Sequence, residues 1–234
     1  MVAGQDLSEP LETRDAIDKR TVHDSLKILK RIRNGHACIM SIVFIVLFPL
    51  GAISIHLPID RVPFLRNTYL KKKVTAIHAP IQLLGLVLML AGMALGVRLA
   101  LDLDYLTLPT QSKYAHPVIG LVVVCTIVVF QPILGTLQHM YFKKTGRKSI
   151  YAYMHRWIGR GAIILGIINN GLGFQLAMND IYIPNSSLIR NFVLAGLLAL
   201  IWFALVIFDW VYPGPSNATD ETRNVSNEGK KIDA

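Results

Sequence analysis

The sequence has few charged residues and few cysteines, and both shortages restrict the class of protein that it can encode. Charged residues occupy 17% of the 234 positions, whereas 53% are hydrophobic and the mean hydropathy is +0.45. This composition is too apolar for an ordinary soluble domain and indicates a membrane protein. Cys38 and Cys125 lie inside apolar runs, so we expect buried thiols rather than a disulfide or a zinc site.

Other absences narrow the function. No Gly-x-Gly-x-x-Gly follows a predicted strand, so a dinucleotide site is not expected. The formal net charge is +9, but the excess lies beside apolar runs, and no basic patch is interleaved with aromatic residues. This favours contact with lipid head groups over nucleic-acid binding. Residues 1–34 are polar and lack the apolar core of a signal peptide.

Five apolar runs are each about long enough to cross ~30 Å of hydrocarbon. They cover residues 37–55, 74–97, 117–138, 157–176 and 188–208. Pro49 and Pro132 predict kinks, and Gly92-x-x-x-Gly96 permits a close helix contact. We therefore predict an all-α, multi-pass integral membrane protein, in which a four-helix transmembrane bundle is joined by a fifth transmembrane helix.

The chain is expected to divide into three parts. Residues 1–34 form a polar segment that ends in a short amphipathic interfacial helix, residues 35–212 form the five-span domain, and residues 213–234 form a disordered tail. Five spans place the termini on opposite sides, which we name side A (N-terminal) and side B. Lysine and arginine are more numerous in the side-B loops, which predicts that side B is cytoplasmic; the sequence does not indicate which membrane is spanned.

Four histidines stand at the starts of the first four runs. They are His36, His78, His116 and His155. Because successive spans alternate in direction, the first and third of these lie near side A, and the second and fourth lie near side B. Histidine inside a membrane is costly and suggests a functional site. The sequence therefore predicts two pairs of histidines, one pair towards each face of the bundle.

Haem is the group that fits two such pairs. A metal ion alone usually takes more ligands, often carboxylates or Cys, and the first four spans contain no Asp or Glu. Haem iron needs two axial protein ligands, because the porphyrin supplies four nitrogens. We therefore expect the bundle to bind two b-type haems, and Gly85, Gly120 and Gly159 to make room for the macrocycles. The alternative role for a single such histidine is a helix-start or interfacial residue.

Several cations lie close to the predicted ligands. Arg156 and Arg160 follow His155, Lys113 precedes His116, and Arg33 precedes His36. We expect Arg156, Arg160 and Lys113 to contact the haem, with propionates as partners; simple anchoring at the membrane surface is the alternative. The three other histidines have lesser roles. His56 and His139 are expected to be interfacial anchors, and His23 is expected to be solvated.

Two axial histidines saturate the iron, so the expected chemistry is outer-sphere electron transfer rather than substrate binding at the metal. Two haems near opposite faces would then form a path across the bilayer. A metal-ion transporter would need carboxylates inside the spans, which the first four lack. A haem-containing partner or sensor subunit without its own reductase activity is the remaining alternative.

The ordered motifs resemble the cytochrome b-561 superfamily, over about residues 35–210. The likeness is to the five-span membrane domain that often follows a DOMON or cellobiose-dehydrogenase-like cytochrome domain. The motifs are Gly35-His36, Pro49-Leu50-Gly51-Ala52, His78-Ala79-Pro80-Ile81-Gln82, His116-Pro117-Val118-Ile119-Gly120, Leu134-Gly135-Thr136-Leu137-Gln138, His155-Arg156-Trp157-Ile158-Gly159 and Asn169-Asn170-Gly171.

The resemblance implies two b-type haems, with ligand pairs His36/His116 and His78/His155, and an oxidoreductase that moves electrons across the membrane. It implies a small donor such as ascorbate and an acceptor such as monodehydroascorbate or a ferric chelate. A soluble redox domain usually precedes this membrane unit and is absent from the sequence, so we expect either a stand-alone form or a truncated chain. A separate redox protein as partner and a homodimer are both left open.

Overall fold

The computed structural model describes residues 11–61, 63–65, 68–103, 115–147, 149–180 and 185–212. These residues form helices and turns, with no strand among them. Five helical stretches within them are long and apolar enough to span a bilayer. They are Thr21–Ser54, Ala76–Asp102, Ala115–Thr145, Ile150–Met178 and Ser186–Phe208. The predicted all-α, multi-pass membrane architecture is confirmed.

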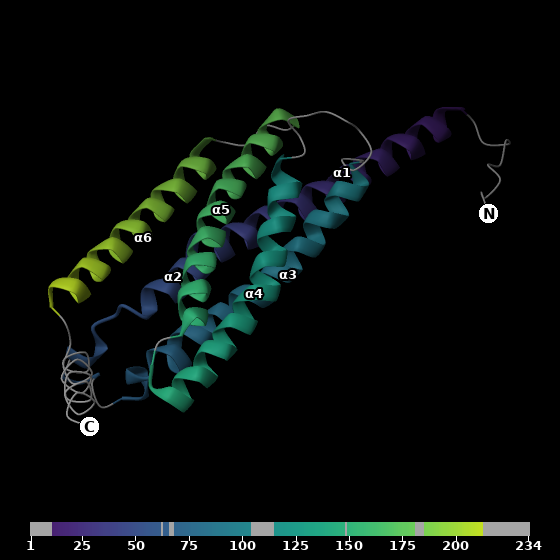
Figure 1. The fold of residues 1–234 in the computed structure, drawn as a ribbon. Helices are drawn as coiled ribbons and strands as arrows, with labels where there is room; N and C mark the ends of the chain where they lie inside the picture. The colour runs from purple at the N-terminus through teal and green to yellow at the C-terminus, as the bar shows by residue number, and fades with distance from the viewer. Residues whose placement is uncertain are drawn as a thin grey trace, which may run out of the picture.

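The spans form a bundle that is flanked by the last helix. Span one joins α1 (Leu11–Ser41), η1 (Ile42–Leu47) and α2 (Phe48–Ser54), and span two joins η4 (Val74–His78) and α3 (Ala79–Asp102). Two short 3₁₀ turns lie between them, η2 (Ile59–Arg61) and η3 (Tyr69–Lys71). Spans three to five are α4 (Ala115–Thr145), α5 (Ile150–Asp180) and α6 (Asn185–Val211). Figure 1 shows α6 along one flank of the bundle, and α1 extending beyond the other helices.

Two π-helical turns precede prolines. Proline lacks an N–H, so it cannot bond the carbonyl four residues earlier, and a wider turn lets the neighbouring amides reach back one residue further. In η1 the N–H of Phe48 bonds the carbonyl of Val43, directly before Pro49. In η4 the N–H of Ala79 bonds the carbonyl of Val74, directly before Pro80. In contrast, α4 is α-helical on both sides of Pro132.

The described structure differs from the expectations in several places. Residues 26–33 are part of α1 rather than a separate interfacial helix, because the helix runs unbroken from Leu11. The helices α4 and α5 extend into the predicted 139–154 loop. Cys38 and Cys125 are free but exposed on the outer surface of the bundle, where lipid would solvate a small apolar side chain. The tail 213–234 and the loop that carries Lys113 lie outside the described residues.

The buried core lies half-way along the bundle. Its members come from all four bundle spans: Val43, Phe44, Phe48, Met89, Val123, Val124, Ile127 and Ala162. In the sequence, each of them lies seven or more positions beyond the histidine that begins its span, so apolar side chains fill the space between the two faces. The Phe44 and Phe48 rings contact each other edge-to-face, with their centres 5.4 Å apart.

A small polar cluster joins the last helix to the bundle. The hydroxyl of Ser41 in α1 accepts hydrogen bonds from the amides of Asn170 in α5 and Asn191 in α6, each at 3.2 Å. Hydrogen bonds between helices fix their relative rotation inside a membrane, where unpaired polar groups are costly.

Candidate functional site

The structure brings the four predicted histidines together in two pairs. The ring centres of His36 and His116 lie 6.0 Å apart, and those of His78 and His155 lie 6.3 Å apart. In both pairs the ring planes are steeply inclined, at 85° and 75°. Each pair joins opposite spans of the bundle, one and three or two and four. These are the partners expected from the alternation of span direction.

Each imidazole is held by a backbone carbonyl of a neighbouring span. Three of these hydrogen bonds join Nδ1 of His36 to Gly92 O at 2.8 Å, Nδ1 of His78 to Gly51 O at 2.8 Å, and Nδ1 of His116 to Asn169 O at 2.9 Å. His155 bonds the backbone of Gln131. Spans one and two therefore hold each other's histidines, and spans three and four do the same.

These bonds determine the tautomer of the rings. A carbonyl oxygen can only accept, so the bonded Nδ1 must carry the proton. In a neutral imidazole, Nε2 then keeps its lone pair and is free to bind a metal. Ligand histidines in metalloproteins are commonly oriented in this way, by donating their second ring N–H to a carbonyl. The rings of His36, His78 and His116 are thus prepared as Nε2 ligands.

A single packing rule recurs at all four histidines. The residue that offers the carbonyl lies opposite the residue four positions after the histidine, and one of these two is always glycine. The opposed residues are Gly92 with Met40, Gly51 with Gln82, Asn169 with Gly120, and Gln131 with Gly159. A glycine on one helix and a larger side chain on the other let the two backbones approach closely while the groove stays filled.

This rule changes the role expected for three glycines. Gly85, Gly120 and Gly159 were expected to make room for a macrocycle, but their open sides are filled by the side chains of Phe48, Asn169 and Gln131, respectively. The structure thus gives these glycines a role that was not expected from the sequence. Their lack of a side chain serves contact between helices.

Three other glycines touch the imidazoles directly, and the sequence analysis missed this role. A Cβ atom built on Gly96 would lie 2.7 Å from Cε1 of His36, and one built on Gly173 would lie 2.7 Å from Cε1 of His116. A Cβ on Gly135 would lie 3.4 Å from His155 Cε1. Each of these glycines comes four residues after the carbonyl that holds the same histidine. The bonded carbonyl has no signal in the sequence; only Gly92-x-x-x-Gly96 marks one of these positions, as a close helix contact.

The spacing of the rings fits an iron between two axial histidines. An imidazole nitrogen binds a transition metal at about 2.0–2.1 Å, so two axial nitrogens lie about 4 Å apart. The centre of each ring lies about 1 Å behind its nitrogen, which places the two ring centres about 6 Å apart. The observed 6.0 and 6.3 Å agree with this separation.

The donor set also favours a haem over a metal ion bound by protein alone. Within the described part of the chain, no three His, Cys, Asp or Glu side chains gather closely enough to hold an ion. Two buried polar atoms near the side-A pair have no protein partner among the described residues. One is Nη1 of Arg33, one turn before His36. The other, Oδ1 of Asn169, makes no hydrogen bond of good geometry but lies close to His116, which the Asn169 carbonyl holds. An unpaired guanidinium nitrogen beside a ligand helix suits an anionic group such as a propionate.

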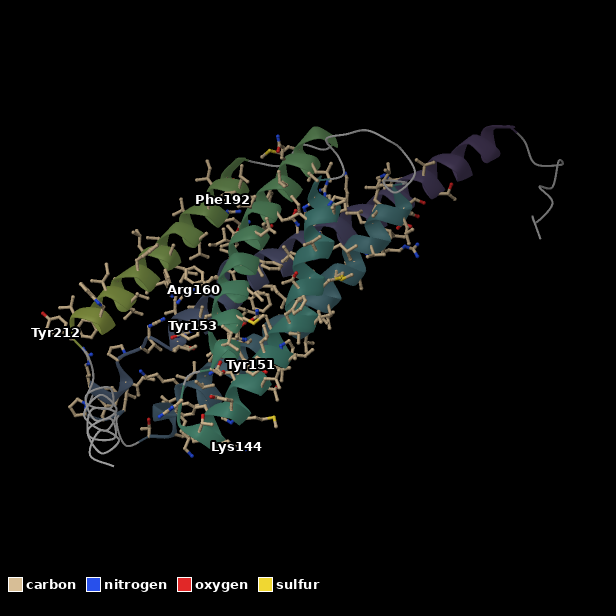
Figure 2. All side chains as sticks on the ribbon, in the orientation of Figure 1. Lys144, Tyr151, Tyr153, Arg160, Phe192 and Tyr212 are labelled. Carbon is tan, nitrogen blue, oxygen red and sulfur yellow. The ribbon has the colours of Figure 1, made fainter. Side chains whose placement is uncertain are left out.

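The other predicted site residues lie as follows. Arg156 bonds the carbonyl of Ala152 at 3.1 Å and stacks on Tyr153, with 4.9 Å between the guanidinium carbon and the ring centre. Arg160 lies 5.0 Å from the Trp202 ring and 5.6 Å from the Trp157 ring. Figure 2 shows Arg160 between α5 and α6, on the side of α5 that faces the last helix. Lys113 falls outside the described residues.

The remaining histidines belong to neither pair. His56 contacts Trp202 edge-to-face, with 6.3 Å between ring centres, and His23 and His139 are exposed. The four candidate ligands therefore differ from the other three histidines both in position and in the residues that they contact.

Comparison of the chain with protein-family models, with characterised proteins and with solved structures gives no significant match. What the site can do follows from its own geometry.

Proposed function

We propose that the protein carries electrons across a membrane through two b-type haems. His36 and His116 would hold one haem near side A, and His78 and His155 would hold the other near side B. A small reductant such as ascorbate would supply the electrons, and an acceptor such as monodehydroascorbate or a ferric chelate would take them on the other side. The protein would thus act as a transmembrane oxidoreductase of the cytochrome b-561 type.

One observation supports this proposal above all others. Four histidines form two pairs at the separation expected of axial ligands. Three of the four rings donate Nδ1–H to a carbonyl, which leaves Nε2 free. Histidines that only anchored helix ends would not need to meet across the bundle, and would not each need a carbonyl from the next span. When bound, each haem supplies a one-electron Fe(III)/Fe(II) couple.

The surrounding residues would have three tasks. The carbonyls orient the rings and raise their basicity as ligands. His36 and Gly51 are separated by roughly 20 Å along span one, at a rise of 1.5 Å per residue. The apolar core between them excludes water. Arg33 and Arg156 offer positive charge near the ligands, where propionates or an anionic reductant would be stabilised.

The direct test is the haem content of the purified full-length protein. We expect the reduced-minus-oxidised spectrum of a six-coordinate b-type haem, with about two haems per chain. His116→Leu and His155→Leu should each remove one haem, whereas His139→Leu should keep both, because His139 is exposed on the same helix as His116 and belongs to neither pair. Protein without haem would falsify the proposal.

Electron transfer across the bilayer is tested in liposomes. With ascorbate inside and ferricyanide outside, we expect reduction of ferricyanide by the wild-type protein, and loss of this reduction in either histidine variant. A protein that keeps both haems but does not reduce ferricyanide would instead be a haem-containing partner or sensor subunit.

A further inference from the structure

Arg160 places a positive charge inside a transmembrane span, on the helix α5. Its guanidinium group makes no hydrogen bond or ion pair with any other described residue. Its contacts are with two aromatic rings, Trp157 one turn earlier in α5 and Trp202 in α6. A charge in a span is costly unless it is paired, so Arg160 requires an anionic partner that is not a described side chain.

The guanidinium group of Arg160 lies close to the side-B surface of the membrane. Side chains of an α-helix lean towards its N-terminus, and α5 begins at side B, so this group lies over the turn of Trp157. Tyr153, Trp157 and Tyr212 are exposed at the same end of the molecule (Figure 2). Exposed Tyr and Trp rings mark the level of lipid head groups, so Arg160 can place its charge at that level.

The position of Arg160 separates it from the proposed haem site. It points away from the histidine pair, about 140° around α5 from His155, and Figure 2 shows it between α5 and α6. Its planar group lies over two rings, which cannot accept hydrogen bonds along its edge as an oxygen does. The five N–H donors at that edge fit the oxygens of a phosphate in a bidentate contact.

The surface that continues from Arg160 towards the bilayer centre is apolar. Ile164 and Ile168 follow it at intervals of four residues, on the same face of α5, and are 58% and 50% exposed. A positive charge at head-group level with an apolar surface beneath it matches both halves of a phospholipid. A soluble anion would use only the charge.

We propose that Arg160 is the centre of a binding site for an anionic phospholipid of the side-B leaflet, at the junction of α5 and α6. The lipid phosphate accepts N–H bonds from the guanidinium group, and an acyl chain lies against Ile164 and Ile168. Side B is the predicted cytoplasmic side, where anionic lipids are concentrated and where basic pockets between helices bind lipid head groups. The bound lipid neutralises Arg160 and joins α6 to the bundle.

The test is quenching of tryptophan fluorescence by brominated lipids, with the full-length protein in phosphatidylcholine vesicles. Trp157→Phe and Trp210→Phe together leave Trp202 as the one tryptophan of the chain and keep a ring at both positions. We expect brominated phosphatidylserine to quench Trp202 at a mole fraction about fivefold lower than brominated phosphatidylcholine. This preference corresponds to about 1 kcal/mol for one arginine near an anionic surface.

Variants of Arg160 in the same background identify the residue that selects the lipid. Arg160→Gln should abolish the preference, and Arg160→Lys, which keeps the charge without the bidentate edge, should retain part of it. If Arg160→Gln does not fold, the intermediate preference of Arg160→Lys carries the test. Arg98→Gln is the matched control, because Arg98 already pairs with Asp102 near the side-A end of α3; it should keep the full preference.

Three results would overturn the inference. Equal quenching by the two brominated lipids in the protein with Arg160 intact would mean that no anionic lipid is selected. An undiminished preference in the Arg160 variants would assign the selection to other cations. Displacement of brominated phosphatidylserine by inorganic phosphate would identify a site for soluble anions instead of lipid. A protein without haem would remove the proposed function and leave this inference unchanged, because the site does not include the haem ligands.

Discussion

Substitution of Gly96 by alanine tests the side-A site most sharply. The new Cβ would lie 2.7 Å from Cε1 and 2.9 Å from Nδ1 of His36. Carbon atoms in favourable contact lie about 3.5–4.0 Å apart, so the ring must retreat by about 1 Å. His36 cannot make this movement and keep its 2.8 Å hydrogen bond to Gly92 O, because that carbonyl lies one turn before Gly96 on the same helix.

The size of the effect follows from the tolerance of metal–ligand bonds. Such distances hold within about 0.2 Å, so a displacement of about 1 Å removes His36 as a ligand. Overpacking of a tight helix contact also costs about 1–3 kcal/mol. We therefore expect Gly96→Ala to contain about one haem per chain instead of two, and to unfold at a lower temperature than the wild type.

The chain provides a graded set of controls for this experiment. Gly173→Ala should also lose the side-A haem, since its Cβ would lie 2.7 Å from His116. Gly135→Ala should keep the side-B haem, because its Cβ would make an ordinary contact at 3.4 Å from His155. Gly161→Ala meets nothing within 4 Å and should be neutral or stabilise its helix by up to about 1 kcal/mol.

Haem is assayed as a pyridine complex, against protein concentration, and thermal unfolding is followed by circular dichroism in detergent. If Gly96→Ala retains two haems with an unchanged spectrum, then Gly96 does not define the position of His36 and the reasoning fails. Loss of haem in Gly161→Ala would equally refute it, because the effect would then not depend on the contact with an imidazole.

Two further predictions concern the attachment of α6. Ser41→Ala removes the hydrogen bonds to one asparagine in α5 and one in α6. Because such bonds contribute about 0.6 kcal/mol each and at most about 1.7, the substitution should lower the free energy of unfolding by about 1–2 kcal/mol. Denaturation in a detergent series measures this, and an unchanged stability would contradict it. Arg160→Gln should destabilise the contact with Trp202 by about 0.5–2 kcal/mol and shift tryptophan emission to the red. Arg156 stacks on a residue of its own helix, α5, so Arg156→Gln should leave the Trp202 contact unchanged.

The main features of the fold could be predicted from the sequence because a membrane imposes simple constraints. Each span must be a helix of about 20 apolar residues, so the run lengths gave the five spans. Antiparallel neighbours then determine which histidines share a face, and His36 and His116 meet as this alternation requires. The missing N–H of Pro49 predicts a break in the helical hydrogen bonds, and the structure has a π turn before it, whereas α4 continues as an α-helix through Pro132.

The rotation of each helix about its axis could not be predicted in the same way. Arg160 was expected beside the haem of His155, but five residues at 100° each place it about 140° around the helix from that histidine. The structure has it against Trp202 on α6. The partners of the imidazoles were not predicted either, because a backbone carbonyl carries no sequence signal, and Gly92-x-x-x-Gly96 indicates a close contact without naming its occupant.

His-x-x-x-Gly occurs in spans three and four but not in spans one and two. A comparison of the two cases shows the physical reason for the motif. In α4 and α5 the glycine follows the histidine, and the larger side chain, Asn169 or Gln131, stands on the helix opposite. In spans one and two this is reversed, with Met40 or Gln82 after the histidine and the glycine opposite. Both arrangements bring a carbonyl within reach of Nδ1. The ligand geometry therefore depends on the combined size of two facing residues. A sequence motif within one helix contains only one of these two residues.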